Sequence, residues 1–186
     1  MQSFLELARA RYSCRSFDSK PVESEKITKI LQAAQVAPTC VNRQPWRAWV
    51  IQGAKALSRA YEATRFNFDA PLIIAVGVKP GSGWTRRCDE HDFVDVDGAI
   101  VATHMMLEAQ DLGLYSTWVG YFDPKVLADS FEEMKDYRML AMLEIGYPSP
   151  QGVPSARHEE RKSLNELVSI IKQVVHSLAR WTPQSI

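Results

Sequence analysis

Residues 71–78, PLIIAVGV, form a nearly continuous apolar run. A strand that is buried on both faces has this composition, because neither of its sides meets water. The run therefore predicts a central strand of a sheet, and the rest of the chain is interpreted around it.

Helical and strand-like patterns alternate on both sides of this run. Capping signals mark several helix starts, with Ser24 and Asp97 as expected caps and Asp123 followed by a proline at the first helical position. Gly113 is expected to end one of the helices. The expected helices span residues 4–12, 25–36, 55–63, 98–112, 124–131 and 163–181. Other strands are expected at residues 47–53 and 139–148, and residues 115–122 are expected to form a strand and a loop. This mixture predicts an α+β or α/β fold with about four or five strands.

Composition excludes several function classes. The 186 residues carry 22 basic and 22 acidic side chains, so the zero net charge argues against a basic nucleic-acid-binding face. No apolar run approaches the ~20 residues that a membrane span needs, and the first residues lack a signal-peptide pattern, so a cytoplasmic location is expected. The three cysteines form no C-x-x-C pair and no two histidines are three or four apart, so neither a disulfide framework nor a metal site is expected.

A first group of polar residues lies near the N-terminus, where Arg11, Ser13 and Arg15 occupy alternate positions around Tyr12. In an extended segment, alternate side chains project to one side, and two guanidinium groups with a hydroxyl group bind phosphate well. The alternative interpretation is a solvated helix end with scattered arginines.

A second polar group lies in residues 37–46, APTCVNRQPW. Thr39, Asn42 and Gln44 offer hydroxyl and amide groups, and the prolines at both ends stiffen the loop before any ligand arrives. The alternative is a turn whose polar side chains bond only to their own backbone.

The longest irregular segment spans residues 79–93 and contains Trp84, Arg86 and Arg87. It is interpreted either as an active-site lid or as a mobile surface loop. Nucleophile elbows, dinucleotide fingerprints and paired catalytic carboxylates are missing from the sequence, which fits an enzyme whose chemistry belongs to a cofactor.

Five motifs in order, RYSCRSFDSKPV, AAQVAPTCVNRQPW, DAPLIIAVGV, LGLYSTWVGYFD and IGYP, resemble those of the FMN-dependent nitroreductase family. The resemblance covers residues 5–168. It implies an α+β, three-layer fold with a mostly antiparallel central sheet, an obligate homodimer, and FMN at the dimer interface. Arg11 and Ser13, with Tyr12 between them, would hold the FMN phosphate, and Arg15 would lie at the N1 and C2-carbonyl edge of the flavin.

The same resemblance assigns further residues to the flavin site. The loop between the helix and the first strand would contact the flavin of the partner subunit through Pro38, Thr39, Cys40, Asn42 and Gln44. Trp118, Val119 and Gly120 would lie against the flavin, Asn67 would bond to its ring, and Arg161 would be a second phosphate ligand.

The resemblance also implies a reaction. An FMN-dependent NAD(P)H oxidoreductase would reduce nitroaromatics, quinones or similar acceptors by ping-pong hydride transfer, with Trp84, Arg86 and Arg87 as candidates for the substrate pocket. The alternative is a flavoprotein that stores or senses FMN without reductase activity. We expect one domain over residues 1–186, with the apolar-striped helix 163–181 packing on the partner subunit. The alternative is that this helix buries its apolar stripe against its own domain.

Overall fold

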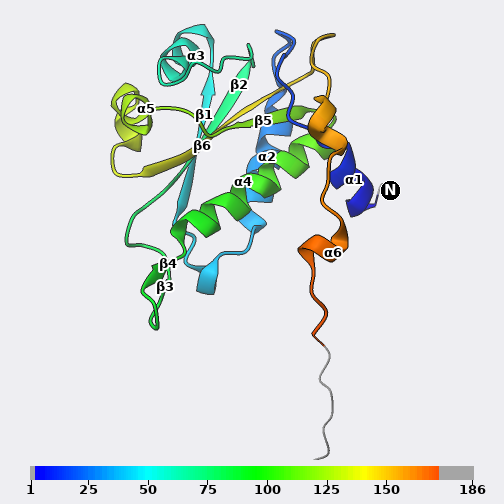
Figure 1. The fold of residues 1–186 in the computed structure, drawn as a ribbon. Helices are drawn as coiled ribbons and strands as arrows, with labels where there is room; N and C mark the ends of the chain where they lie inside the picture. Colours follow the sequence, from blue (N-terminus) through cyan, green and yellow to red (C-terminus); the bar gives the residue numbers. More distant parts are fainter. Residues whose placement is uncertain (1–2, 172–186) are drawn as a thin grey trace, which may run out of the picture. The chain divides into compact units, whose positions relative to one another are not determined.

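The structure is a computed structural model that describes residues 3–171, and the chain divides into two compact units after Ser155. The first unit contains a four-stranded antiparallel sheet in the order β1-β2-β6-β5 (Figure 1). Its strands are β1 (Trp46–Gln52), β2 (Leu72–Val78), β5 (Tyr115–Val119) and β6 (Arg138–Gly146). A separate hairpin joins β3 (Thr85–Arg86) to β4 (His91–Asp92).

The apolar run that predicted a central strand forms β2, and all seven of its residues are buried. It lies between β1 and β6, so both of its edges are hydrogen-bonded as well as both of its faces covered. The prediction of a central buried strand is therefore confirmed.

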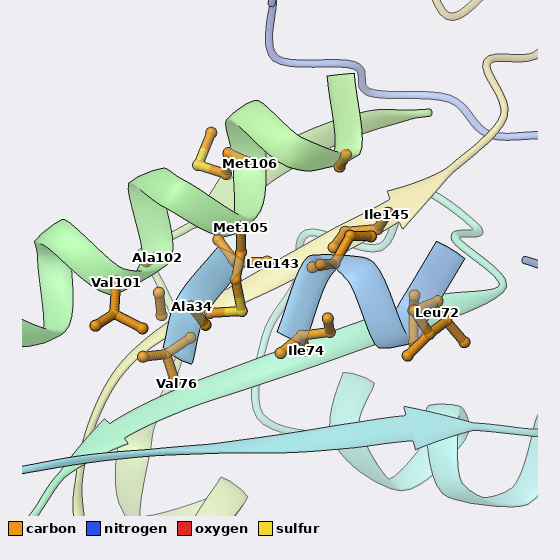
Figure 2. Close-up of a cluster of buried hydrophobic side chains, with 14 of the residues drawn as sticks. Ala34, Leu72, Ile74, Val76, Val101, Ala102, Met105, Met106, Leu143 and Ile145 are labelled. Carbon is orange, nitrogen blue, oxygen red and sulfur yellow. The ribbon is translucent and has the colours of Figure 1, made fainter. Parts of the chain in front are cut away.

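Helices cover both faces of the sheet, which gives three layers. On one face, α2 (Ser24–Val36) and α4 (Val94–Asp111) pack through Ala34, Val101 and Met105 on side chains such as Ile74 of β2 (Figure 2). On the other face, α3 (Ala54–Tyr61) and α5 (Pro124–Ser130) pack on the alternate residues, among them Ile73. Burying one such side chain contributes roughly 1.5–3 kcal/mol, so the two clusters hold the sheet between the helix layers.

Two predicted helix caps are wrong. Helix α2 already includes Ser24 and follows Glu23, and α4 begins at Val94, so Asp97 lies inside its first turn. The predicted cap at Asp123 is confirmed, because its carboxylate accepts hydrogen bonds from two backbone N–H groups of α5. Gly113 follows α4 with φ +73°, as its predicted role at the helix end requires.

The first helix is shorter than predicted. Helix α1 spans Phe4–Ala10, and Arg11 is already extended, with φ −68° and ψ 125°. A backbone bridge from Ser13 to Ser116 of β5 holds the segment in this extended form. Helix propensity cannot predict such a contact, because the two residues are far apart in the sequence.

The second unit begins at Ala156 with a short 3₁₀ helix, Ala156–Glu159. Its helix α6 spans only Leu164–Leu167, and Ser163 and Glu166 form a capping box at its start. Val168 is extended, so the prediction of a continuous helix from residue 163 is wrong at this point, and residues 172–181 lie outside the described part of the chain. Helix α6 is a single turn without a buried residue, so it gains little packing energy. Because helix nucleation is costly, such a turn does not extend into a longer helix.

Within residues 3–171, no helix is long and apolar enough to cross a membrane. The same residues contain no group of acidic, histidine and cysteine side chains that could hold a metal ion.

Candidate flavin site

The segment from Arg11 to Arg15 lies beside β5. Ser13 forms a parallel bridge with Ser116, and the backbone nitrogen of Cys14 donates to the Ser116 oxygen at 3.1 Å. The hydroxyl group of Thr117 donates to the Cys14 oxygen. The segment therefore adds a short extended piece to the sheet edge, and its alternate side chains lie on opposite sides of that piece.

Tyr12 and Cys14 anchor this segment. The Tyr12 hydroxyl donates to the Gly152 oxygen at 2.5 Å, and its ring centroid lies 4.8 Å from that of Tyr115. Burial raises the pKa of Tyr12 to about 12, so its hydroxyl group stays protonated and available as a donor. The Cys14 side chain is completely buried. Tyr12 therefore has a structural partner, whereas Arg15 is exposed.

Arg15 lines a cavity of about 280 Å³ together with residues from the end of β5. The lining residues are Arg15, Phe66, Phe68, Thr117, Trp118, Val119, Gly120 and Tyr121. One guanidinium nitrogen of Arg15 donates to the Ser13 oxygen at 3.2 Å, and the side chain is exposed. The structure thus brings Arg15 together with the predicted residues Trp118, Val119 and Gly120, which follow it by more than a hundred positions.

The loop 37–46 has a strained backbone. Val41, Asn42 and Gln44 have φ values of 45°, 56° and 50°, in the left-handed region that residues other than glycine rarely adopt. Such conformations cost of order 1–3 kcal/mol each and often occur at binding sites. Some polar groups of the loop form hydrogen bonds with one another. The side-chain amide of Gln44 donates to the Asn42 side chain at 3.1 Å, and the Thr39 hydroxyl group accepts from the backbone nitrogen of Gln44 at 3.0 Å. Asn42 and Gln44 remain exposed to solvent.

Asp97 anchors this loop to α4. Its carboxylate is fully buried and accepts a hydrogen bond from the backbone nitrogen of Cys40 at 2.8 Å. Its second oxygen is buried and has no hydrogen-bond partner among the described residues. Burial is the main cause that raises the pKa of the Cys40 thiol, and the negative charge of Asp97 is the second cause. The thiol therefore stays neutral.

The predicted site residue Asn67 is not among the residues that line the cavity. The Asn67 side chain is exposed and accepts from the Asp69 nitrogen at 2.8 Å, although its neighbours Phe66 and Phe68 line the cavity. Arg161 belongs to the second unit, where it donates to the carbonyl oxygens of His158 and Glu160.

The three substrate-pocket candidates lie on or beside the β3–β4 hairpin. Trp84 packs on Phe93 with ring centroids 5.3 Å apart, and Arg86 forms an ion pair with Asp89. Arg87 is exposed in the turn. None of the three is among the residues that line the cavity beside Arg15. Figure 1 shows the hairpin at the start of α4, away from α3 and α5.

Sequence reasoning missed several residues of the cavity and its support. Phe66, Phe68 and Tyr121 line the cavity, and Glu144 lies buried at the centre of the sheet. The only signal for Glu144 was a single acidic residue inside the apolar run of the last strand.

The composition of the cavity suits a flavin. An arginine beside aromatic side chains can accommodate an aromatic ring that gains negative charge. This composition is chemically suited to a planar group that accepts electrons.

Comparison with known proteins identifies the family of this chain. The model of the nitroreductase family matches residues 8–65 and 64–147. The chain belongs to the nitroreductase family. A nitroreductase family protein from Clostridium difficile 630 has 40% sequence identity and a TM-score of 0.84, over 92% of this chain and 100% of that chain.

More distant relatives carry functional names. An FMN-dependent nitroreductase from Clostridium difficile R20291 is 21% identical, with a TM-score of 0.68 over 86% of this chain and 98% of its own. The major NAD(P)H-flavin oxidoreductase of Aliivibrio fischeri is 22% identical over 87% of this chain and 95% of its own length. The α+β three-layer fold is thus shared across this range of sequence identity.

Proposed function

We propose that this chain is an FMN-dependent NAD(P)H oxidoreductase that reduces planar, electron-poor acceptors such as nitroaromatics and quinones. Family membership and the names of two relatives support the general activity. The observation that carries the proposal is the single cavity in which Arg15 meets the end of β5 and two phenylalanines.

Each part of this cavity has a physical task toward FMN. Arg15 supplies a fixed cation, which favours negative charge on a reduced ring at the N1 and C2-carbonyl edge. Trp118 would supply an aromatic surface for a flat ring, and Gly120, which has no side chain, would leave room for that ring. Arg11 and Ser13 project from alternate positions of the same segment and would hold the phosphate, which guanidinium and hydroxyl groups bind well.

Bound FMN would supply the N5 atom, which accepts hydride from NAD(P)H and delivers it to the acceptor. The protein's own residues would orient the nicotinamide and the acceptor in turn over one face, which gives ping-pong kinetics. A hollow of about 540 Å³ shares Tyr121 with the flavin cavity, and the departing and entering molecules would pass through it.

A second subunit would complete the site. The cavity volume of about 280 Å³ is just below the ~300 Å³ at which pockets for small molecules usually begin, so it can seat only part of FMN. The exposed amides of Asn42 and Gln44, held on a strained loop, are available to a flavin of the partner. The proposal therefore includes a homodimer in which each loop serves the other subunit's cofactor.

The test is a visible absorption spectrum of the purified protein before and after anaerobic addition of NADPH and then NADH. We expect a flavin spectrum that bleaches, and parallel double-reciprocal plots when an acceptor such as a quinone is varied. A flavin spectrum that persists with both donors would instead support a storage or sensor protein. Failure to bind added FMN would overturn both.

Arg15→Ala tests the proposed ring contact, and Lys55→Ala on α3 is the matched loss of an exposed cation. Arg15→Ala should weaken FMN binding at least about tenfold, because the loss of one charge-assisted hydrogen bond costs about 1.5–3 kcal/mol. Lys55→Ala should leave FMN affinity unchanged. Equal affinities of the two variants would contradict the assignment of Arg15.

A further inference from the structure

Glu144 lies in the middle of the sheet, where a carboxyl group is unexpected. It is completely buried on β6, between Ile73 of β2 and Thr117 of β5 in the register of the sheet. Burying a carboxyl group is costly unless hydrogen bonds compensate for the water that it loses. The partners of Glu144 therefore indicate why the residue is tolerated there.

One carboxyl oxygen of Glu144 accepts two hydrogen bonds. The hydroxyl group of Tyr61, on α3, donates to it at 2.9 Å, and the backbone nitrogen of Phe68 donates at 3.2 Å. The other carboxyl oxygen is buried and has no hydrogen-bond partner among the described residues. Glu144 thus connects the sheet to the segment that carries Phe66 and Phe68.

Phe68 is held at both of its backbone groups. Its nitrogen donates to Glu144, and its oxygen accepts from the backbone nitrogen of Phe17 at 3.1 Å. Phe17 follows Arg15 by two residues, so one short chain of hydrogen bonds joins β6, the phenylalanine wall and the end of the arginine segment. Both the wall and Arg15 line the same cavity.

We propose that Glu144 is a positioning residue for the flavin cavity, which fixes the Phe68 backbone and thereby the wall formed by Phe66 and Phe68. The inference rests on the proposed function, because it concerns the affinity of that same cavity for FMN. Positioning through a buried acceptor is effective because loss of the Glu144 carboxyl oxygen would leave the Phe68 N–H without this hydrogen-bond partner.

The protonation state does not remove this contact. Burial raises the pKa of Glu144 to about 7, and the groups that face it are the Tyr61 hydroxyl from α3 and the nearby Asp69 carboxylate. In the neutral acid the proton can sit on the oxygen that lacks a partner, so the other oxygen still accepts from Tyr61 and Phe68. Glutamine can present its carbonyl oxygen in the same way, whereas methionine keeps a similar volume and has only a weak acceptor.

The experiment compares Glu144→Gln, Glu144→Met and Tyr61→Phe with the wild type. Flavin-free protein is titrated with FMN by fluorescence quenching, the visible spectrum of the bound flavin is recorded, and the melting temperature of the flavin-free protein is measured. Tyr61→Phe is the matched control, because it removes one hydrogen bond to Glu144 and leaves the bond to Phe68.

We expect Glu144→Met to weaken FMN binding at least about tenfold and to shift the visible spectrum, while Glu144→Gln stays within about threefold of the wild type. Tyr61→Phe should lower the melting temperature with little change in FMN affinity. Wild-type FMN affinity in Glu144→Met would overturn the inference. So would equal losses of affinity in Glu144→Met and Tyr61→Phe, because that result means a general loosening of the fold.

A wild type that does not bind FMN would instead overturn the proposed function, and the two failures are therefore distinguishable. If Glu144→Met does not fold, the inference is tested instead by the amide hydrogen exchange of Phe68 in the wild type. Slow exchange in the flavin-free protein that slows further with FMN supports the inference, and fast exchange in both states overturns it.

Discussion

The backbone nitrogen of Cys40 donates a 2.8 Å hydrogen bond to the buried carboxylate of Asp97, which joins the strained loop 37–46 to α4. Asp97→Ala leaves the Cys40 N–H without this partner, so we expect a loss of about 1–3 kcal/mol in the free energy of unfolding. The measurement is urea unfolding of the flavin-free protein. If the loop contacts the partner's flavin, as proposed, FMN affinity should fall as well.

Asp95→Ala is the matched control for this prediction. Asp95 also lies in the first turn of α4, but it is exposed and pairs with Arg138 at the surface. Exposed ion pairs contribute about 0–1 kcal/mol, so this variant should be close to the wild type in both measurements. Similar losses in the two variants would mean that the first turn of α4, and not the bond to Cys40, carries the effect.

Gly152 packs closely against the segment that carries Arg11 and Arg15. A Cβ atom at this position would lie 2.4 Å from the Ser16 oxygen and 2.9 Å from the Cys14 sulfur. Gly152→Ala should therefore destabilise the protein by about 1–3 kcal/mol, as overpacking does elsewhere. Thermal unfolding of the flavin-free protein checks this. Gly120→Ala is the comparison, since its Cβ would make only an ordinary 3.5 Å contact with Trp118, and equal melting temperatures would contradict the prediction.

The buried carboxyl group of Glu144 should make stability depend on pH. Burial raises its pKa from 4.5 to about 7, so the folded state keeps a proton that the unfolded state releases in this range. Stability should therefore fall as pH rises from about 4.5 to about 7, by about 3 kcal/mol in total. Urea unfolding of the flavin-free protein at about pH 5 and about pH 8 measures the change. In Glu144→Gln this part of the pH dependence should vanish, and its persistence would assign it to another group.

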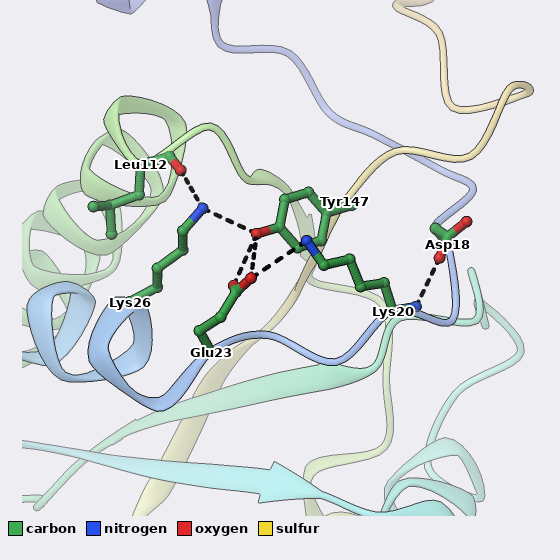
Figure 3. A network of polar contacts seen from close by, with 6 residues as sticks. All are labelled: Asp18, Lys20, Glu23, Lys26, Leu112 and Tyr147. Carbon is green, nitrogen blue, oxygen red and sulfur yellow. Dashed lines mark hydrogen bonds and ion pairs between the residues drawn. The ribbon is translucent and has the colours of Figure 1, made fainter.

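Glu23 should act in the opposite direction at low pH. Hydrogen bonds from its own backbone and from the Tyr147 hydroxyl lower its pKa to about 2, within a network that also includes Lys20 and Lys26 (Figure 3). This contribution is present above the ordinary pKa of 4.5 and is lost as pH falls toward 2.

Tyr147→Phe removes the hydroxyl group at the centre of this network, so the acid unfolding midpoint should move to a higher pH. Circular dichroism during acid titration is the measurement. Glu25→Gln, in the same first turn of α2, is the control and should leave the midpoint unchanged. An unchanged midpoint in Tyr147→Phe would show that the network does not contribute to acid stability.

Local patterns in the sequence were sufficient for much of the fold. The apolar run of β2 and the capping pair Asp123–Pro124 depend on neighbours along the chain, and both predictions are confirmed. The extended form of the segment from Arg11 to Arg15 is not local in origin, because a bridge from Ser13 to Ser116 holds a segment whose first two residues were predicted to be helical. The predicted helix at residues 163–181 failed at Val168, because an apolar stripe gives a helix only when something buries it.

The sequence by itself determined which residues are apolar, which segments can be helix or strand, and which polar groups share a short stretch. Only the tertiary structure decided that Arg15 meets Trp118, that Asp97 holds Cys40, and that Glu144 holds Phe68. These pairs depend on the strand order β1-β2-β6-β5 and on the register of the strands. That order and register result from many weak contacts between residues that are distant in the sequence. A periodicity reports whether a side chain meets water, and it carries no information on which distant partner the side chain meets instead.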